Sequence, residues 1–98
     1  MLTSSRQIHS LDDLRNYVYE TICDHHELAV GAFQMTERIL VRGTAACGIY
    51  FCVHGPRAVK MTAIWETDRN TILFYDPSGE RFHRTQLMAA PQLVHAAA

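Results

Sequence analysis

The stretch VKMTAIWETDRNTILFYDPSGERFHRTQL, residues 59–87, decides the fold because it holds three segments of period-two alternation cut by two turns. The later turn, residues 76–80, carries the clearest local signal. Pro77 fixes φ at the first turn position, and Gly79 supplies the positive φ of a bulged three-residue loop. Connections this short join neighbouring strands in antiparallel fashion. The stretch therefore predicts a three-stranded meander, with strands at residues 59–66, 71–76 and 81–87.

The same alternation continues upstream of this meander. It predicts two further strands, at residues 35–41 and 47–53, with turn residues at 42–45 and 54–57. Before Gly31 the period changes from two residues to that of a helix. The apolar side chains that form one helical stripe are Leu11, Leu14, Val18 and Ile22.

Ser10 marks the start of this helix. Its hydroxyl can accept a hydrogen bond from the backbone N–H of Asp13, with Asp13 reaching back as in a capping box. We expect the helix to run to about His26. The predicted fold is α+β, with one N-terminal helix packed on one face of a five-stranded antiparallel meander. The predicted division is a mobile N-terminus at residues 1–9, a single domain at 10–87 and a mobile C-terminal tail at 88–98.

The composition is that of one globular domain. Hydrophobic residues make up 48% of the 98 residues and charged residues 19%, which is outside the range of disordered chains. The net charge of −1 provides no overall field for nucleic acid or for an anionic membrane, so neither is a predicted partner. Three cysteines and no apparent signal peptide predict no disulfide framework and a cytoplasmic location.

The turns also predict the register of the strands. We expect Trp65 opposite Ile72, and Phe74 opposite both Ala63 and Phe82. Carried back through the second hairpin, this register sets Val53, Phe51 and Ile49 beside Val59, Met61 and Ala63. All of these side chains fall on one side of the sheet, which predicts the core face beneath the helix.

The face of the sheet opposite the helix is expected to be unusually apolar. Tyr50, Thr62 and Tyr75 are predicted side by side, with Ile64 paired to Leu73. The candidate binding residues on this face are Tyr50, Cys52, His54, Thr62, Ile64, Leu73, Tyr75, Arg81 and His83. Aromatic side chains mixed with arginine are typical of binding surfaces. The alternative interpretation is that Tyr and Thr are simply good strand formers, and that scattered exposed apolar side chains are ordinary.

Two patterns suggest chemistry. Cys52 and His54 lie two residues apart on one strand, and a thiolate beside an imidazole is how cysteine nucleophiles are activated. The segment 23–26, Cys-Asp-His-His, offers zinc ligand types, but its spacing matches no metal motif. Histidines near the C-terminus of a helix more often complement the helix dipole.

Nucleic-acid and nucleotide sites receive less support. Arg81, Phe82 and Arg84, with Arg57 and Lys60, could form a basic aromatic strip, but the two strand arginines around Phe82 are expected on different faces. A solvated edge strand explains this segment better. The glycines form no phosphate-binding loop, and no cofactor is predicted.

The sequence thus predicts a non-catalytic protein-interaction module that binds a second copy or another protein through the face opposite the helix. The alternative is that this face binds a small ligand, or performs a simple hydrolysis with His54 as the base.

Overall fold

The computed structural model describes residues 2–88 of the chain. Its elements, in chain order, are β1 (Leu2–Arg6), α1 (Leu11–His25), β2 (Met35–Arg42), β3 (Ala45–His54), a short 3-10 turn (Pro56–Ala58), β4 (Lys60–Glu66), β5 (Thr71–Tyr75) and β6 (Arg81–Leu87). Within this described part, no helix has the length and apolar composition needed to cross a membrane.

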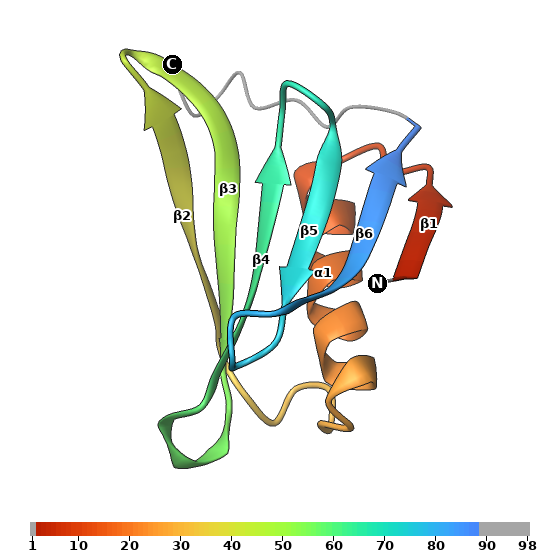
Figure 1. The fold of residues 1–98 in the computed structure, drawn as a ribbon, viewed down its shortest axis with the longest axis vertical. Helices are drawn as coiled ribbons and strands as arrows, with labels where there is room; N and C mark the ends of the chain where they lie inside the picture. The colour runs from red at the N-terminus through yellow and green to blue at the C-terminus, as the bar shows by residue number, and fades with distance from the viewer. Residues whose placement is uncertain (1, 89–98) are drawn as a thin grey trace.

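The strands form one six-stranded sheet in the order β1-β6-β5-β4-β3-β2 (Figure 1). Strands β2 to β6 are the predicted antiparallel meander, and β1 pairs in parallel with β6. The α+β class with a single helix on a sheet is therefore confirmed. The prediction of five antiparallel strands is wrong, because the sheet has six strands of mixed direction.

The sixth strand comes from the segment expected to precede the domain. Residues 2–6, LTSSR, show no apolar alternation, so the sequence pattern gives no strand signal there. Pairing with β6 uses backbone groups, which do not depend on side-chain pattern. The backbone N–H of Met88 also donates to the carbonyl of Arg6 at 2.7 Å. The ordered sheet thus begins before the boundary predicted at Ser10, and the predicted C-terminal tail lies, except for Met88, outside the described residues.

Helix α1 starts where its cap predicts. The Ser10 hydroxyl accepts from the backbone N–H of Asp13 at 3.1 Å, and Asp12 and Asp13 occupy the first turn. Leu14, Val18 and Ile22 are fully buried, as their spacing predicts. The helix therefore presents one apolar stripe to the sheet.

The core forms between this stripe and the predicted side of the sheet. Trp65 and Phe74 are 1% and 0% exposed, and Trp65 pairs with Ile72 as expected. The remaining buried strand residues of the cluster are Ile49, Phe51, Val53, Met61, Ala63 and Leu87. The indole N–H of Trp65 donates to the side-chain oxygen of Asn70 at 3.0 Å, which satisfies the one polar group of this side chain.

The second hairpin has the predicted faces but different partners. Val53 pairs with Met61 and Phe51 with Ala63, a shift of two residues from the predicted register. The shift follows from the turn: the Gly55 N–H donates to the carbonyl of Val59 at 2.8 Å, which leaves Val59 outside the ladder. A shift of two keeps every side chain on its face, so the core prediction survives.

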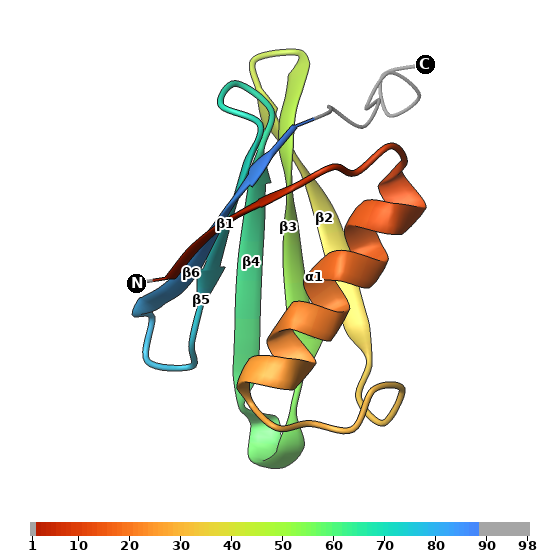
Figure 2. The same cartoon turned by 90° about the vertical axis from the view of Figure 1, so that its right-hand side faces the viewer.

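The helix covers only part of its side of the sheet. An α-helix with side chains is about 10–12 Å wide, whereas six strands at about 4.8 Å spacing span about 24 Å. Helix α1 lies closest to β3 and β4. Figure 2 shows α1 along one side of the sheet and no other described element on the opposite side. Two surfaces of the sheet therefore have no helix or strand over them: the face opposite α1, and the part of the helix side beside β1.

Candidate functional site

The first candidate site is the face of the sheet opposite α1. We call it the open face and define it by the side chains of Thr36, Arg38, Tyr50, Cys52, His54, Lys60, Thr62, Ile64, Leu73, Tyr75, Arg81 and Arg84. Its centre consists of two rows across the strands. One row runs Arg38, Tyr50, Ile64, Leu73, Arg84, and the other runs Thr36, Cys52, Thr62, Tyr75, Arg81.

These rows confirm some predicted neighbours and correct others. Thr62 pairs with Tyr75, and Ile64 pairs with Leu73, as predicted. Tyr50 does not lie beside Thr62: it pairs with Ile64, and Cys52 takes the place beside Thr62. The cause is the same two-residue shift in the second hairpin. The two tyrosines are therefore in different rows rather than in one line.

The prediction that His83 lies on the open face is wrong. Phe74 pairs with His83 and Tyr75 pairs with Arg81, so Phe82 is an extra residue in β6, a β-bulge. Beyond the bulge the alternation is offset by one residue. His83 therefore points to the helix side, and Arg84 takes a position on the open face beside Leu73.

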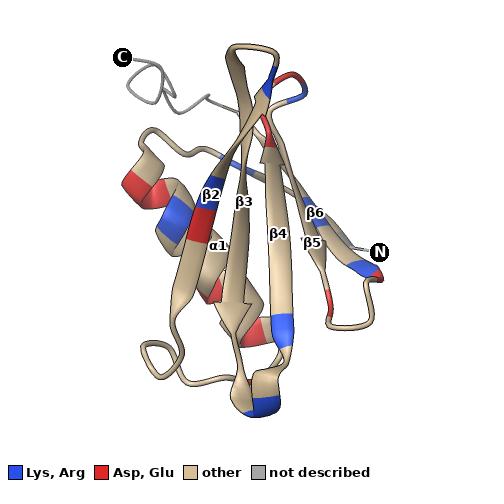
Figure 3. Cartoon of the chain, turned by 90° about the vertical axis from the view of Figure 1, so that its left-hand side faces the viewer, with Lys and Arg blue, Asp and Glu red and all other residues tan. Residues whose placement is uncertain are grey.

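The open face is basic around an apolar centre. The Arg38 guanidinium lies 5.4 Å from the centroid of the Tyr50 ring, and that of Arg81 lies 5.6 Å from the centroid of Tyr75. Both distances are in the range of cation–π contacts. Figure 3 shows basic segments on β2, β4 and β6, whereas α1 carries mostly acidic ones. The register places one carboxylate, Glu66, on the same side of β4.

The predicted Cys52–His54 pair is not arranged as a nucleophile and its base. The Cys52 side chain is only 5% exposed, and burial raises the pKa of its thiol. The imidazole Nε2 of His54 is hydrogen-bonded at 2.8 Å to the hydroxyl of Thr36 on the neighbouring strand. A thiol with a raised pKa is a poor nucleophile, so the geometry favours a packing role for Cys52.

The Cys-Asp-His-His segment also has a structural explanation. Cys23 is fully buried, and the ring of His25 stacks on Phe82 with centroids 3.7 Å apart. Among residues 2–88, no three His, Cys, Asp or Glu side chains come close enough together to hold a metal ion. Burial, and then the charge of His25, lowers the pKa of His26, whose Nε2 is buried without a hydrogen-bond partner.

A second candidate site, which the sequence did not reveal, lies on the helix side between β1 and α1. The Ser4 hydroxyl is 3.0 Å from Nε2 of His83 and 3.2 Å from the hydroxyl of Thr85. The Tyr17 hydroxyl lies 2.7 Å from that of Thr85 and 3.4 Å from that of Ser4. Four polar side chains from three elements thus form one hydrogen-bonded cluster.

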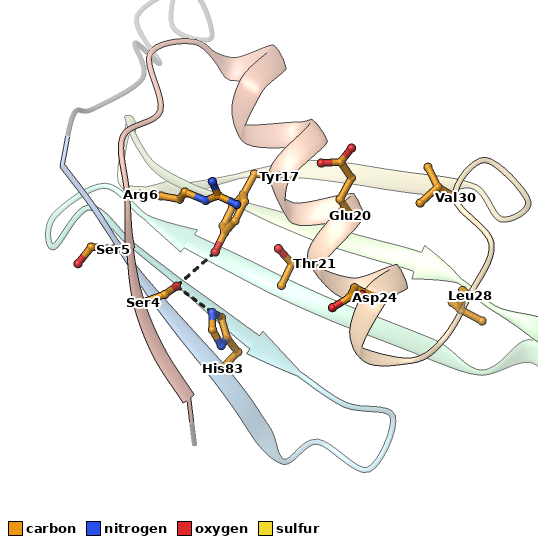
Figure 4. A pocket seen from close by; sticks show the side chains of 10 residues that line it. All are labelled: Ser4, Ser5, Arg6, Tyr17, Glu20, Thr21, Asp24, Leu28, Val30 and His83. Atoms are coloured by element: carbon orange, nitrogen blue, oxygen red, sulfur yellow. Dashed lines mark hydrogen bonds between the residues drawn. The ribbon is translucent and has the colours of Figure 1, made fainter.

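This cluster forms the floor of a groove of about 780 Å³. Figure 4 shows Ser4, Tyr17 and His83 pointing toward one another, with Arg6 beside Tyr17 and with Glu20, Thr21 and Asp24 along the helix. Leu28 and Val30 line the far end. Burial, and then the charge of His25, lowers the pKa of His83, so this imidazole is neutral near pH 7. We call this site the β1–α1 groove.

The sequence contained little signal for this groove. Ser4 lies in a stretch without periodicity, and the helical pattern places Tyr17 beside the apolar stripe without indicating a site. The alternation in the last strand predicts His83 on the face opposite the helix. A search for known relatives adds no function, since the chain matches no protein family, no curated protein and no solved structure.

Proposed function

We propose that this chain is a non-catalytic protein-interaction domain whose open face binds a protein segment that carries apolar side chains flanked by carboxylates. The observation that carries the proposal is the row Arg38, Tyr50, Ile64, Leu73, Arg84. A solvated antiparallel face is ordinarily polar. Here three adjacent strands contribute large apolar or aromatic side chains, with an arginine at each end of the row.

A recess at one end of the open face supports the proposal. It measures about 430 Å³, and its lining combines apolar Leu40 and Ile64 with two basic side chains and two acidic ones, which are Arg42, Arg69, Glu66 and Asp68. Binding energy at protein interfaces concentrates on a few anchoring side chains that fill such pockets. An apolar side chain of the partner fits beside Leu40 and Ile64, whereas the charges around the recess balance, so the preference for carboxylates rests on the arginines of the row.

The charge pattern favours a different protein over a second copy. In a stacked-sheet dimer whose two rows are parallel, a two-fold axis acts on the row in one of two ways. It sets Arg38 against Arg84 of the second copy, or it sets each arginine against its own equivalent. Both arrangements oppose like charges in a desolvated interface, which is unfavourable. An acidic partner pairs with these arginines instead.

The same face is less suited to single-stranded nucleic acid. Bases bind such proteins by stacking on free aromatic rings. Here the rings of Tyr50 and Tyr75 each have a guanidinium over them. The space between the two tyrosines is filled by Ile64, Leu73 and Thr62, which offer no ring for stacking.

Selection from a library of random peptides displayed on phage, with the intact chain as target, tests this proposal. We expect enriched peptides to combine apolar residues with Asp or Glu and to bind less tightly as salt is raised. Leu73→Asp should abolish their binding, and Arg84→Ala should weaken it about tenfold, the effect of losing one charge-assisted contact. Glu27→Gln, which removes an exposed carboxylate just after α1 and outside both sites, is the matched control and should leave binding unchanged.

The proposal is wrong if the enriched peptides lack acidic residues, or if they bind Leu73→Asp as well as the parent. Sedimentation equilibrium of the chain alone tests the alternative that the open face binds a second copy of the chain. A dimer that Leu73→Asp dissociates would support this alternative. Binding of a single-stranded oligonucleotide that competes with the peptides would identify nucleic acid as the partner instead.

A further inference from the structure

We propose that the β1–α1 groove is a second, separate binding site, which takes a short peptide of two or three residues with free termini. The inference is independent of the open face. It rests on the shape of the groove, on its fixed polar floor, and on the opposite charges at its two ends.

The groove follows from the architecture. Helix α1 packs on β3 and β4, and its Tyr17 and His25 side chains reach Thr85 and Phe82 on β6, so the surface left open on this side of the sheet lies beside β1. An uncovered part of a core face would expose apolar side chains if the strand pattern simply continued. The groove is instead lined there by Ser4 and His83, which lie over the fully buried Thr85. The volume of about 780 Å³ is in the range of small-molecule sites.

The floor is polar, nearly uncharged and held in place. Ser4 donates to or accepts from three neighbours, and the His83 ring packs against Phe74 with centroids 5.5 Å apart. Side chains fixed in this way lose little further freedom when a ligand binds. The Ser4 hydroxyl uses its full hydrogen-bonding capacity on these neighbours, whereas the Tyr17 hydroxyl, with two partners, and the Thr21 hydroxyl can bond the amide groups of a peptide.

The ends of the groove carry opposite charges. Arg6 lies at one end, with its guanidinium 4.8 Å from the centroid of the Tyr17 ring. Asp24 lies two helical turns further on, and Glu20 lies between (Figure 4). Arg6 can bind a carboxylate, and Asp24 can bind an ammonium group. Two carboxylates against one guanidinium disfavour a polyanion such as a nucleotide.

The spacing of these charges sets the length of the ligand. Tyr17 and Asp24 are seven residues apart on α1, which is about 10 Å at 1.5 Å per residue. An extended peptide advances about 3.5 Å per residue, so two or three residues span the distance between the terminal charges. Leu28 and Val30, the latter 64% exposed, lie beyond Asp24 and offer contact to an apolar side chain near the free amino end.

Isothermal titration calorimetry with the tripeptide Leu-Ala-Ala on the intact chain tests the inference. We expect saturable binding that falls about tenfold when the peptide is N-acetylated, and about tenfold when it is C-amidated, since each change removes one charge-assisted contact. Asp24→Asn should remove the penalty for acetylation but keep that for amidation, and Arg6→Gln should do the reverse. Glu80→Gln, which removes a carboxylate outside the groove, should change neither.

Two results would overturn the inference. One is the absence of saturable binding to a chain whose Trp65 fluorescence shows it to be folded. The other is equal binding of the free, acetylated and amidated peptides. Leu73→Asp separates this site from the open face: if that variant abolished tripeptide binding while Asp24→Asn and Arg6→Gln did not affect it, the peptide would be binding at the open face, and the groove site would be refuted.

Discussion

Adjacent residues on β5 give the sharpest test of which face is core and which is open. Phe74 is fully buried beneath α1, and its ring contacts those of Tyr17, Phe82 and His83. Truncation of a buried phenylalanine to alanine costs about 3–5 kcal/mol of the free energy of unfolding. Leu73, its neighbour, is only half-buried on the open face. Full burial of a leucine contributes about 1.5–3 kcal/mol, so Leu73→Ala should cost about 1 kcal/mol.

Urea unfolding followed by tryptophan fluorescence measures both costs. Trp65 is the single tryptophan of the chain and is buried in the native state, so its emission reports the whole transition. Domains of this size have about 5–15 kcal/mol of stability. Phe74→Ala should therefore unfold at a much lower urea concentration than the parent, whereas the midpoint of Leu73→Ala should be close to that of the parent. Equal losses for the two variants would mean that the open face is covered. A larger loss for Leu73→Ala would mean that the register of β5 is off by one residue.

Three further predictions concern titration, a buried hydrogen bond and thiol reactivity. Burial lowers the pKa of His26 and of His83 below their unfolded values of about 6.5, so the unfolded state binds more protons and stability should fall as the pH drops below about 6.5. Urea titrations at about pH 7.5 and pH 5.5 measure this, and His26→Gln and His83→Gln should each reduce the difference in stability between the two pH values. An unchanged difference in both variants would contradict the prediction. Asn70 has a φ of 49°, so Asn70→Gly removes the acceptor of the buried indole N–H without straining the backbone, and it should cost about 1–3 kcal/mol. A loss below about 0.5 kcal/mol in Asn70→Gly would show that this hydrogen bond contributes little. In the native protein a thiol reagent should modify half-buried Cys47 before Cys52, whose thiol is buried with a raised pKa, and Cys47→Ser should remove the fast phase; a fast phase that persists in this variant would contradict the assignment.

Much of the fold could be predicted because local signals agreed with one another. The Ser10 cap, the Leu14–Val18–Ile22 stripe and the turn at residues 76–80 each follow from the backbone preferences of a few neighbouring residues. The two sides of β4 and β5 also follow from sequence alone, since alternation along a strand requires no knowledge of its partner. For the same reason, the open-face positions of Tyr50, Ile64, Leu73 and Tyr75 were predicted correctly.

The remaining features depended on contacts between distant parts of the chain. The bulge at Phe82 has no signature in β6 itself. In the structure it lets two consecutive residues face the helix side, where Phe82 stacks on His25 and His83 bonds to Ser4. Those contacts join residues 57 or more positions apart, and their free energy decides the register of β6 beyond the bulge. This register is also the reason why Arg84 lies on the open face, where the sequence predicted His83.

The strand β1 illustrates the same division between local and distant causes. One helix, a five-strand meander and the side of the sheet that forms the core were predictable from the sequence, because these depend on short-range dihedral preferences and on periodicity. Only the tertiary structure decided that LTSSR adds a parallel strand along β6, and that one helix leaves a polar groove beside it. Backbone pairing at a sheet edge does not depend on the side-chain pattern, so the sequence pattern does not predict it. The width of a helix relative to that of a sheet likewise cannot be predicted from any local stretch of sequence.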